Sequence, residues 1–404
     1  MIHPSAAAPP ATDVPTGRPI HVVQLGYDDS VFAPDAASDT VARQLAYARA
    51  LDAQVPGSRL ALLSVTTRAE PREFALEGMR FVPMHAPRAR HLLPRLYQTL
   101  ERLHAERPID VIASQTVQED GWVALAFGRR RGVPVVGQLH YDLFSPHARE
   151  EHFGGSAIGR ARYTLSLRSL RRFPALRVVG ERLRAELVAR GYAGRVEVLP
   201  VPVTMDDAGA GPDRRGRDGG GPVVLFVGRL VTSKNLDLWL EVASRVRARR
   251  PDARFEIIGD GPLRATLEER TAVLGLAGVV SFPGAIPYQG LAARYRSAAL
   301  LLLTSHYEGF GRVAVEAGRF GLPVVATRVT GLEDIVEPGV TGELCAPDDA
   351  DGLAASVTSL LDDDAARLRY GEAAARRVRA IYDPTLLAQR WMRLLTDVAR
   401  RPHA

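Results

Sequence analysis

Apolar residues gather in short unbroken runs, and most of these runs are followed by a glycine turn and a segment with helical spacing. Ile20–Leu25, Val133–Leu139 and Leu300–Leu303 have the length and apolarity of strands buried on both faces of a parallel sheet. This alternation predicts Rossmann-like α/β architecture. Further strands are expected at Leu60–Val65, Asp110–Ala113, Leu176–Val179, Val196–Leu199, Val223–Val227, Phe255–Ile258, Val279–Phe282 and Leu322–Ala326, and helices at 37–53, 91–106, 119–131, 181–190, 234–250 and 385–400.

The chain of 404 residues is too long for one ordinary core, so two domains are expected. Residues 206–221 are rich in Gly and Asp and have the composition of an interdomain linker. We therefore expect a disordered tail at 1–18, an N-terminal domain at 19–205 and a C-terminal domain at 222–384.

Composition narrows the class of protein. Cys345 is the single cysteine, which excludes a disulfide framework and makes the reducing cytoplasm the expected compartment. No apolar run approaches the roughly 20 residues that span a bilayer, so any membrane contact is expected to be peripheral. The net charge is +6, and all of this surplus lies in residues 1–205.

Much of the positive charge falls in 158–195, where 158–173 alternates apolar residues with arginine at helical intervals, as in interfacial amphipathic helices. Such a patch suits anionic lipid headgroups or nucleic acid, and a solvated helix face is the plainer interpretation. No nucleic-acid-binding module is recognisable, so no nucleic-acid partner is expected. The arginines are Arg160, Arg162, Arg168, Arg171, Arg172, Arg177, Arg182, Arg184, Arg190 and Arg195, and the segment holds only two glutamates, Glu181 and Glu186.

The stretch 299–316 combines a buried strand, a glycine turn and a helix expected to begin near Arg312. Ligands bind at the carboxyl ends of such strands, where the free amides and dipole of the helix start favour negative charge. Glu308 lies in the turn and Glu316 about one helical turn beyond it, so both carboxylates can face one crevice and accept hydrogen bonds from hydroxyl groups of a long polar ligand. The spacing also fits a solvated turn glutamate and a helix glutamate in an ion pair.

Two cations follow the first strand of the second half. Arg229 directly follows Gly228, and Lys234 is expected at the opening of the next helix. Both reach a diphosphate, arginine as a fork and lysine as a point charge. Lys234 is the only lysine of the chain, and a lysine is disfavoured at a helix start by the dipole, so a specific need for its ammonium is indicated.

A histidine stands at the matching edge of the N-terminal domain. His140 comes directly after the strand ending at Leu139, where it is able to donate to a sugar hydroxyl or to an oxygen that gains charge during reaction. The alternative is a histidine that merely caps the strand. Asp142 is able to orient His140 or an acceptor, although Asp also commonly starts turns.

The Glu-x7-Glu spacing within S-x-x-E-G-F-G resembles the donor-site signature of the family-4 glycosyltransferases, which have the GT-B fold. The resemblance covers nearly all of 20–400 and is specific in the second half. It implies a retaining, metal-independent transferase whose active site lies between two Rossmann-like domains, with the helix at 385–400 crossing back to the first. The motif residues that fall in family order are Gly228-Arg229, Lys234, Gly259-Asp260-Gly261-Pro262, Ser305, Glu308-Gly309-Phe310-Gly311 and Glu316.

The resemblance also implies roles. Glu308 would hold the donor sugar's hydroxyls, Glu316 the ribose, and the amides of Phe310 and Gly311 the sugar and phosphate. Arg229 and Lys234 would neutralise the leaving diphosphate, and His140 matches the family's active-site histidine. The predicted catalytic set is thus Glu308, His140, Arg229 and Lys234, and the predicted donor-binding set is Gly228, Arg229, Lys234, Gly259, Ala285, Glu308, Gly309, Phe310, Gly311 and Glu316.

Two segments depart from the family pattern. Ala36-Ala37-Ser38 stands near the place of the usual paired glycines of the first loop, which leaves that loop's contact with the donor open. Pro200-Val201-Pro202-Val203 replaces the usual Asn-Gly turn at the end of the first domain. Asp348-Asp349-Ala350-Asp351 contains an Asp-x-Asp, but before a helix it is interpreted as a cap, and no metal or other cofactor is expected.

The sequence thus predicts transfer of a hexosyl unit from a nucleotide sugar, with UDP favoured and GDP-mannose as an alternative, to a hydroxyl of a lipid-linked or polysaccharide acceptor. A small soluble acceptor is the first alternative. A nucleotide-sugar epimerase, a phosphorylase of the same fold, or a non-catalytic protein that binds sugar nucleotides remains open as another class. Peripheral contact with an anionic membrane through 158–195 is expected in the lipid-linked case.

Overall fold

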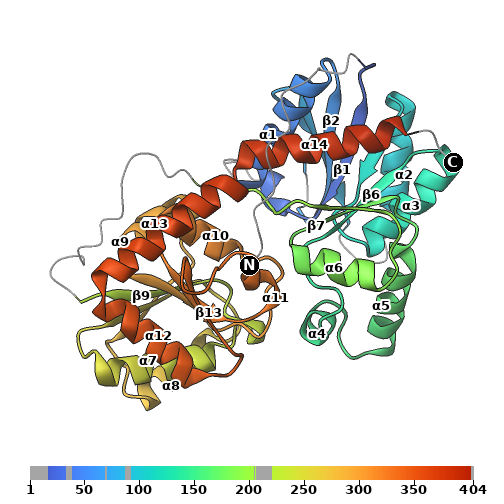
Figure 1. Cartoon of the computed structure of the whole chain (residues 1–404). Coiled ribbons are helices and arrows are strands. Elements are labelled where there is room, and N and C mark those ends of the chain that lie inside the picture. The colour runs from blue at the N-terminus through green and yellow to red at the C-terminus, as the bar shows by residue number, and fades with distance from the viewer. Residues whose placement is uncertain are drawn as a thin grey trace.

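The computed structural model describes residues 17–32, 39–68, 71–86, 92–203, 205 and 221–401. Two α/β domains lie beside each other, as the ribbon shows (Figure 1). The Ala36-Ala37-Ser38 loop lies outside the described residues, as do nearly all of the expected tail and of the 206–221 linker.

The N-terminal domain is built on an eight-stranded sheet with the order β3-β4-β2-β1-β5-β6-β7-β8. All neighbouring pairs are parallel except β3 with β4. Its elements are β1 (His21–Gly26), η1 (Asp29–Phe32), α1 (Asp39–Gln54), β2 (Arg59–Thr66), β3 (Phe74–Leu76), β4 (Met79–His85), α2 (Leu92–Glu106), β5 (Val111–Ala113), α3 (Glu119–Arg131), β6 (Val135–Leu139), α4 (Pro146–Phe153), α5 (Ala157–Leu170), β7 (Ala175–Val178), α6 (Glu181–Ala189) and β8 (Arg195–Val198).

The C-terminal domain is built on a six-stranded parallel sheet with the order β11-β10-β9-β12-β13-β14. The strand order reverses between β9 and β12, the kind of place where doubly wound sheets bind ligands. Its elements are β9 (Val223–Val227), η4 (Thr232–Lys234), α7 (Leu236–Arg249), β10 (Arg254–Ile258), α8 (Arg264–Val273), β11 (Val280–Gly284), α9 (Tyr288–Ser297), β12 (Leu300–Leu303), α10 (Arg312–Arg319), β13 (Val324–Thr327), α11 (Thr330–Glu333), β14 (Gly342–Cys345), α12 (Ala350–Asp362) and α13 (Asp364–Ile381).

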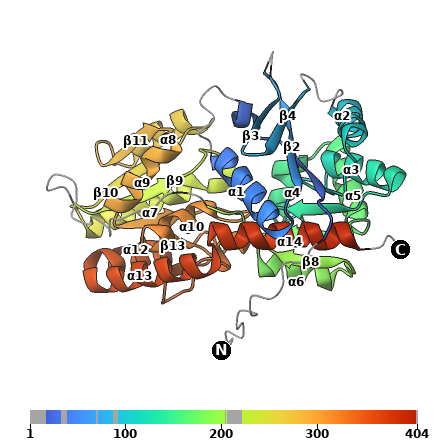
Figure 2. The ribbon, with the colours of Figure 1, turned by 90° about the horizontal axis from the view of Figure 1, so that it is seen from above.

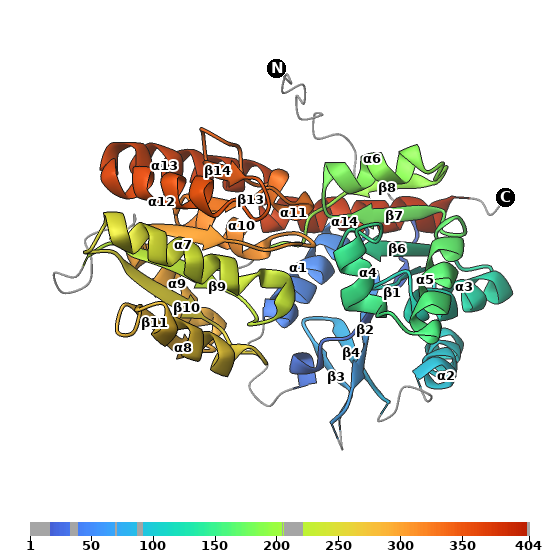
Figure 3. The ribbon, with the colours of Figure 1, turned by 90° about the horizontal axis from the view of Figure 1, so that it is seen from below.

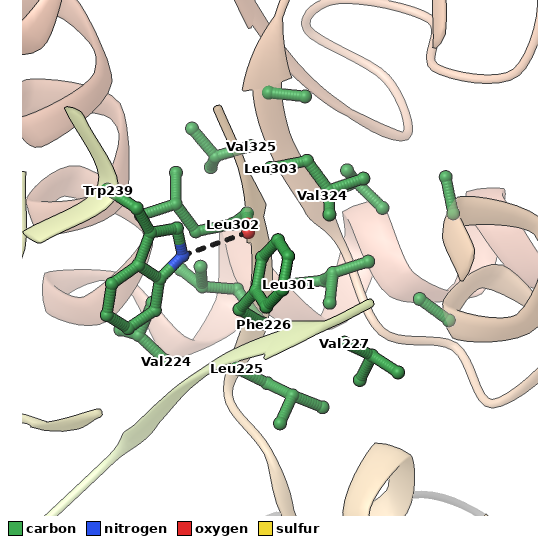
Figure 4. Packing of buried hydrophobic residues seen from close by; sticks show 14 of the residues in the cluster. Val224, Leu225, Phe226, Val227, Trp239, Leu301, Leu302, Leu303, Val324 and Val325 are labelled. Carbon is green, nitrogen blue, oxygen red and sulfur yellow. Dashed lines mark hydrogen bonds between the residues drawn. The ribbon is translucent and has the colours of Figure 1, made fainter. Parts of the chain in front are cut away.

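The core of the C-terminal domain holds β9 and β12 in place beneath the predicted site. Trp239 of α7 is fully buried between Phe226 and Phe255 in edge-to-face contacts, and its Nε1 donates to the carbonyl of Leu302 at 3.1 Å (Figure 4). Because a buried indole N–H needs an acceptor, this bond fixes the helix against the central strand. The carboxyl ends of β9 and β12 are thereby held side by side.

The last helix, α14 (Pro384–Arg400), leaves the C-terminal domain and packs along α1 of the N-terminal domain (Figure 2). Trp391, Leu394 and Leu395 are fully buried there, in one apolar cluster with residues of β1 and β2. The expected crossing back to the first domain is therefore present. Within the described ranges, no helix combines the length and apolarity that a membrane span requires.

Most expected strands and helices are present, with ends that shift by at most two residues. The β3–β4 hairpin and α4 were not expected. One expectation is wrong in its detail: Lys234 does not open α7 but ends the short η4 turn, and Asn235, with a left-handed φ of 47°, separates that turn from the helix.

Candidate functional site

The turn between β12 and α10 places Glu308 in a buried position. Its carboxylate is 7% exposed, and Oε1 accepts one hydrogen bond from Lys234 Nζ at 2.7 Å and another from Ser305 Oγ at 2.7 Å. The predicted cation and the predicted carboxylate, 74 residues apart in sequence, are thus in direct contact. A carboxylate fixed from one side in this way keeps its remaining lone pairs for a ligand.

Main-chain contacts tie the loop after β12 to the loop after β9. His306 N donates to the carbonyl of Ser233 at 3.0 Å, and Thr304 Oγ1 donates to the carbonyl of Asn235 at 2.9 Å. Since each loop is anchored to a buried strand, the position of Lys234 relative to Glu308 follows from the sheet rather than from either loop alone.

Three turns of the C-terminal domain are joined at the same sheet edge by backbone hydrogen bonds. Gly228 N donates to the carbonyl of Ile258, and Gly259 N donates to the carbonyl of Gly284. Gly259 has a φ of 139°, and a Cβ there would lie 1.8 Å from the carbonyl oxygen of Gly228, so only glycine fits. Ala285, expected beside the nucleobase, follows the last of these turns and is exposed.

Glu316 lies in α10 and is only 3% exposed. Its two carboxylate oxygens are held separately: Oε1 accepts from Arg312 Nε at 2.8 Å, and Oε2 accepts from the hydroxyl of Tyr295 at 2.8 Å. Arg312 in turn stacks over the ring of Tyr288, at the start of α9. The predicted ribose carboxylate is therefore oriented by one residue of its own helix and one of α9.

Both glutamates are buried, so neither is a solvated surface carboxylate, whereas Glu316 does form an ion pair within its own helix, with Arg312, as the alternative interpretation expects. Gly311, between them, has a left-handed φ of 75° and precedes α10 directly. Phe310 is 8% exposed, with its ring near Tyr382. Arg229 has an exposed side chain, and the described residues give it no hydrogen bond or ion pair.

The two domains meet at the predicted active-site histidine. A Cβ on Gly309 would lie 2.5 Å from the carbonyl oxygen of His140, so the glycine turn of one domain lies directly against the end of β6 in the other. Thr330 Oγ1 donates to Asp142 Oδ2 at 3.5 Å, and the rings of His147 and His306 stack with centroids 5.5 Å apart. His140 and Glu308 are thus brought to one interface.

His140 is neutral at physiological pH. Burial lowers the pKa of His140 to about 3, and the positive charges of Arg177 and Arg43 act in the same direction. Nε2 is buried and has no hydrogen-bond partner among the described residues. A neutral imidazole with a free ring nitrogen is able to donate or accept one hydrogen bond, depending on its tautomer, and it contributes no charge of its own.

The arginines of 158–195 form a smaller surface patch than the sequence predicted. Arg177 is only 3% exposed, and its guanidinium donates to the carbonyls of Leu199 and Pro200 at 2.8 and 2.7 Å. Three others form ion pairs with carboxylates that lie outside the segment: Arg162 with Glu119, Arg182 with Glu333 and Arg195 with Asp397. Arg184 and Arg190 form ion pairs with glutamates inside the segment. The described part of the chain leaves Arg160, Arg168, Arg171 and Arg172 without a carboxylate partner, all with exposed side chains.

Sequence reasoning missed the side chains that orient the two glutamates. Ser305 belongs to the predicted motif, but its hydrogen bond to Glu308 was not predicted. Nothing in the sequence linked Tyr295 to Glu316. The position of Arg312, four residues before Glu316 on a predicted helix, was the one available signal, because i and i+4 lie on one helix face.

The Asp-x-Asp segment has the structure expected of a cap. Asp349 precedes α12, and its side chain accepts from the amide of Gly352 at 2.8 Å. Among the described residues, no group of three or more His, Cys, Asp or Glu is placed to hold a metal ion.

Two family models match the chain, one for each half. Residues 45–207 match the model described as Glycosyltransferase Family 4, and residues 212–377 match the model described as Glycosyl transferases group 1. The 2-deoxystreptamine glucosyltransferase of Streptomyces kanamyceticus is 33% identical over 294 residues, which are 67% of this chain and 73% of that protein. The glycogen synthase of Mycobacterium tuberculosis is 30% identical over 261 residues, which are 64% of this chain and only 62% of that protein's length.

Solved structures share the arrangement of both domains. Sucrose-phosphate synthase from Thermosynechococcus elongatus superposes with a TM-score of 0.78 at 22% identity, over 94% of this chain and 99% of that one. Anabaena HepE in complex with UDP-glucose superposes with a TM-score of 0.72 at 19% identity, over 94% and 100% of the two chains. The fold is therefore GT-B, with two Rossmann-like domains.

Proposed function

Because the chain belongs to glycosyltransferase family 4, we propose that it transfers a hexosyl unit from a nucleotide sugar to a hydroxyl group with retention of anomeric configuration. The observation that carries the proposal is the contact of Lys234 with Glu308 at the carboxyl ends of β9 and β12. One group is suited to the leaving diphosphate and the other to the sugar hydroxyls, and they lie 2.7 Å apart. That distance suits a ligand in which sugar and phosphate are joined.

In the proposed reaction, positively charged side chains take the role that a divalent metal ion has in other transferases. When the bond between C1 of the sugar and the phosphate oxygen breaks, its electron pair leaves with the diphosphate. Lys234 and Arg229 stabilise that growing charge more in the transition state than in the ground state. We therefore expect transfer to proceed without a divalent ion.

Retention follows if the acceptor attacks the face of C1 that the phosphate leaves. The new C1–O bond forms on that face, and the departing phosphate oxygen accepts the proton of the acceptor hydroxyl. In this proposal the neutral His140 holds the sugar by one hydrogen bond, and Glu308 holds another hydroxyl through the lone pairs that Lys234 and Ser305 leave unused. Trapping of a covalent glycosyl–enzyme would contradict this mechanism.

UDP is the proposed nucleotide and GDP its alternative. The curated relatives include a GDP-mannose-dependent mannosyltransferase of Mycolicibacterium smegmatis at 34% identity over 43% of this chain, while HepE was solved with UDP-glucose. Backbone groups near Ala285 are the proposed contacts with the nucleobase, and Glu316 is proposed to accept hydrogen bonds from the ribose hydroxyls.

The proposed acceptor is lipid-linked, at the surface of an anionic membrane in the reducing cytoplasm. The exposed arginines of α5 and its end support this choice, because arginine near an anionic bilayer strengthens binding. A small soluble acceptor is the alternative, and the resemblance to the 2-deoxystreptamine glucosyltransferase favours it.

The test is turnover in the presence of EDTA, with a panel of UDP- and GDP-sugars and with either membrane lipid extract or soluble cyclitols as acceptor. We expect one donor to release nucleotide only when acceptor is present, the product to keep the donor's anomeric configuration by NMR, and Glu308→Gln to lower the rate at least a hundredfold. An epimerase would change the donor without any acceptor, and a non-catalytic binding protein would turn over none of the panel.

A further inference from the structure

A hollow lies on the N-terminal domain, away from the predicted donor site. It is a groove of about 870 Å³ between α3 and α5. Its lining includes Val133 and Pro174, which stand just before β6 and β7, whereas His140 follows β6 at the opposite end of that strand. Figures 1 and 3 show α3 and α5 on the side of the domain that faces away from the C-terminal domain. A ligand in the groove would therefore not touch the contact between Gly309 and His140 where the two domains meet.

The groove has an apolar floor and a positive rim. Trp122, Val133 and Pro174 are among its apolar lining residues, and three exposed arginines supply the charge at its rim, Arg129 of α3 and Arg168 and Arg172 of α5 and its end. No carboxylate is among the lining residues, all of which belong to the described part of the chain. Three guanidinium groups around an apolar hollow match a ligand with one or more phosphate oxygens attached to hydrocarbon.

Trp122 adds a polar contact inside the groove. The residue lines the groove, and its Nε1 is buried without a hydrogen-bond partner among the described residues. A buried indole N–H normally finds an acceptor, and tryptophan is enriched where an apolar environment meets a polar one. A headgroup oxygen would supply the acceptor that the described residues do not.

Apolar side chains on the same helix extend the groove outward. Ile158 is 75% exposed and Leu165 is 44% exposed, and both project from the side of α5 that carries Arg168 and Arg172. A free phosphate or a soluble phosphoester would gain little from these side chains. A bilayer would bury them while its headgroups meet the arginines.

We propose that the groove between α3 and α5 binds the phosphate headgroup of an anionic membrane lipid, with Arg129, Arg168 and Arg172 on the phosphate and Trp122 at the level of the glycerol backbone. This inference rests on the proposed contact with an anionic membrane, and it replaces the broad patch at 158–195 with one defined site that includes α3. It is independent of the donor chemistry.

The test compares two variants of equal charge. Arg129→Gln/Arg168→Gln/Arg172→Gln removes the rim, and Arg249→Gln/Arg369→Gln/Arg393→Gln removes three exposed arginines elsewhere. Cosedimentation is measured with vesicles of phosphatidylglycerol in phosphatidylcholine and with phosphatidylcholine alone. Each arginine near an anionic surface strengthens binding about fivefold, so the rim variant should bind on the order of a hundredfold more weakly than the parent, and the control variant much less so.

Tryptophan emission supplies a local readout. Trp239 and Trp391 are fully buried, so phosphatidylglycerol with brominated acyl chains should quench mainly Trp122, and Trp122→Phe should abolish most of that quenching. Equal binding of vesicles by the rim variant and the control variant would refute the lipid site in the groove, while the proposed contact with an anionic membrane would remain. No binding of vesicles by the parent would overturn both, without touching nucleotide-sugar turnover.

Two further outcomes would also refute the lipid site. If inorganic phosphate changes the emission of Trp122 while phosphatidylglycerol vesicles are not bound, the groove takes a soluble phosphate. If a single-stranded oligonucleotide is bound and loses its binding in the rim variant, while vesicles are not bound, the ligand is a nucleic acid.

Discussion

Removal of the Lys234 ammonium should destabilise the protein as well as impair its proposed reaction. Lys234→Met keeps most of the side-chain volume but leaves Glu308, a residue only 7% exposed, with Ser305 as the one remaining side-chain donor that the described residues give its carboxylate. Breaking a buried pair costs about 3–5 kcal/mol, and the partial exposure of the lysine, 21%, places the expected loss near 3 kcal/mol. Glu308→Gln should cost about 2 kcal/mol, because the amide oxygen still accepts from Ser305.

A double-mutant cycle isolates the contact. The double variant Lys234→Met/Glu308→Gln leaves no uncompensated charge, so we expect it to be more stable than the sum of the single losses by about 2 kcal/mol. Urea unfolding followed by tryptophan fluorescence measures each free energy of unfolding. The surface pair Arg245–Asp351, whose side chains are 37% and 81% exposed, is the control and should show a coupling below about 1 kcal/mol. Single losses that add within about 0.5 kcal/mol would refute the buried-pair interpretation.

Three further predictions follow from other contacts. Arg312→Gln, which releases one oxygen of Glu316, should weaken UDP binding about tenfold and reduce the preference for UDP over 2′-deoxy-UDP in calorimetry; an unchanged preference would contradict the ribose role. His140→Phe should make the free energy of unfolding less sensitive to acid, because the unfolded histidine takes up a proton below pH 6.5 and the native one only near pH 3. Between pH 7 and pH 4 the parent should therefore lose up to about 3 kcal/mol more than the variant. Urea midpoints that fall in parallel for the two proteins would refute this. Gly259→Ala should lower the free energy of unfolding by at least about 2 kcal/mol, because its Cβ would meet the Gly228 carbonyl. The control Gly275→Ala, whose Cβ meets no atom, should lower it by about 1 kcal/mol. Equal shifts of the urea midpoint would show that the turns are not held together.

The elements that sequence predicted well have strong local signals. The helix expected at 119–131 matches α3, since acidic residues fill its first turn and Gly132 adopts the left-handed conformation after its last. The strand at Leu300–Leu303 matches β12 because four consecutive leucines suit a strand buried on both faces.

The elements that were missed have weak or ambiguous signals. β3, Phe74–Leu76, is short and lies at the edge of the sheet, with Ala75 and Leu76 exposed, so no apolar alternation marks it. α4 is polar along its length, although Ser145 followed by Pro146 at the first helical position was a usable start signal.

The site was predicted as a set of residues but not as a set of contacts. The resemblance to the family placed Glu308 and Lys234 in one donor site, yet the salt bridge between them depends on β9 and β12 being neighbours in the sheet. The prediction of a broad positive patch at 158–195 was wrong for the same reason. Carboxylates that neutralise Arg162, Arg182 and Arg195 come from distant parts of the chain, which a count within one segment does not include.

The most direct test of the donor site is a calorimetric titration of UDP, GDP and ADP in EDTA, on the parent and on Lys234→Ala. We expect one nucleotide to bind the parent without metal, and the substitution to weaken its binding by about ten- to a hundredfold through loss of one charge-assisted contact with the diphosphate. If none of the three nucleotides binds the parent, or if Lys234→Ala binds as tightly as the parent, the assignment of this sheet edge as the diphosphate site is wrong.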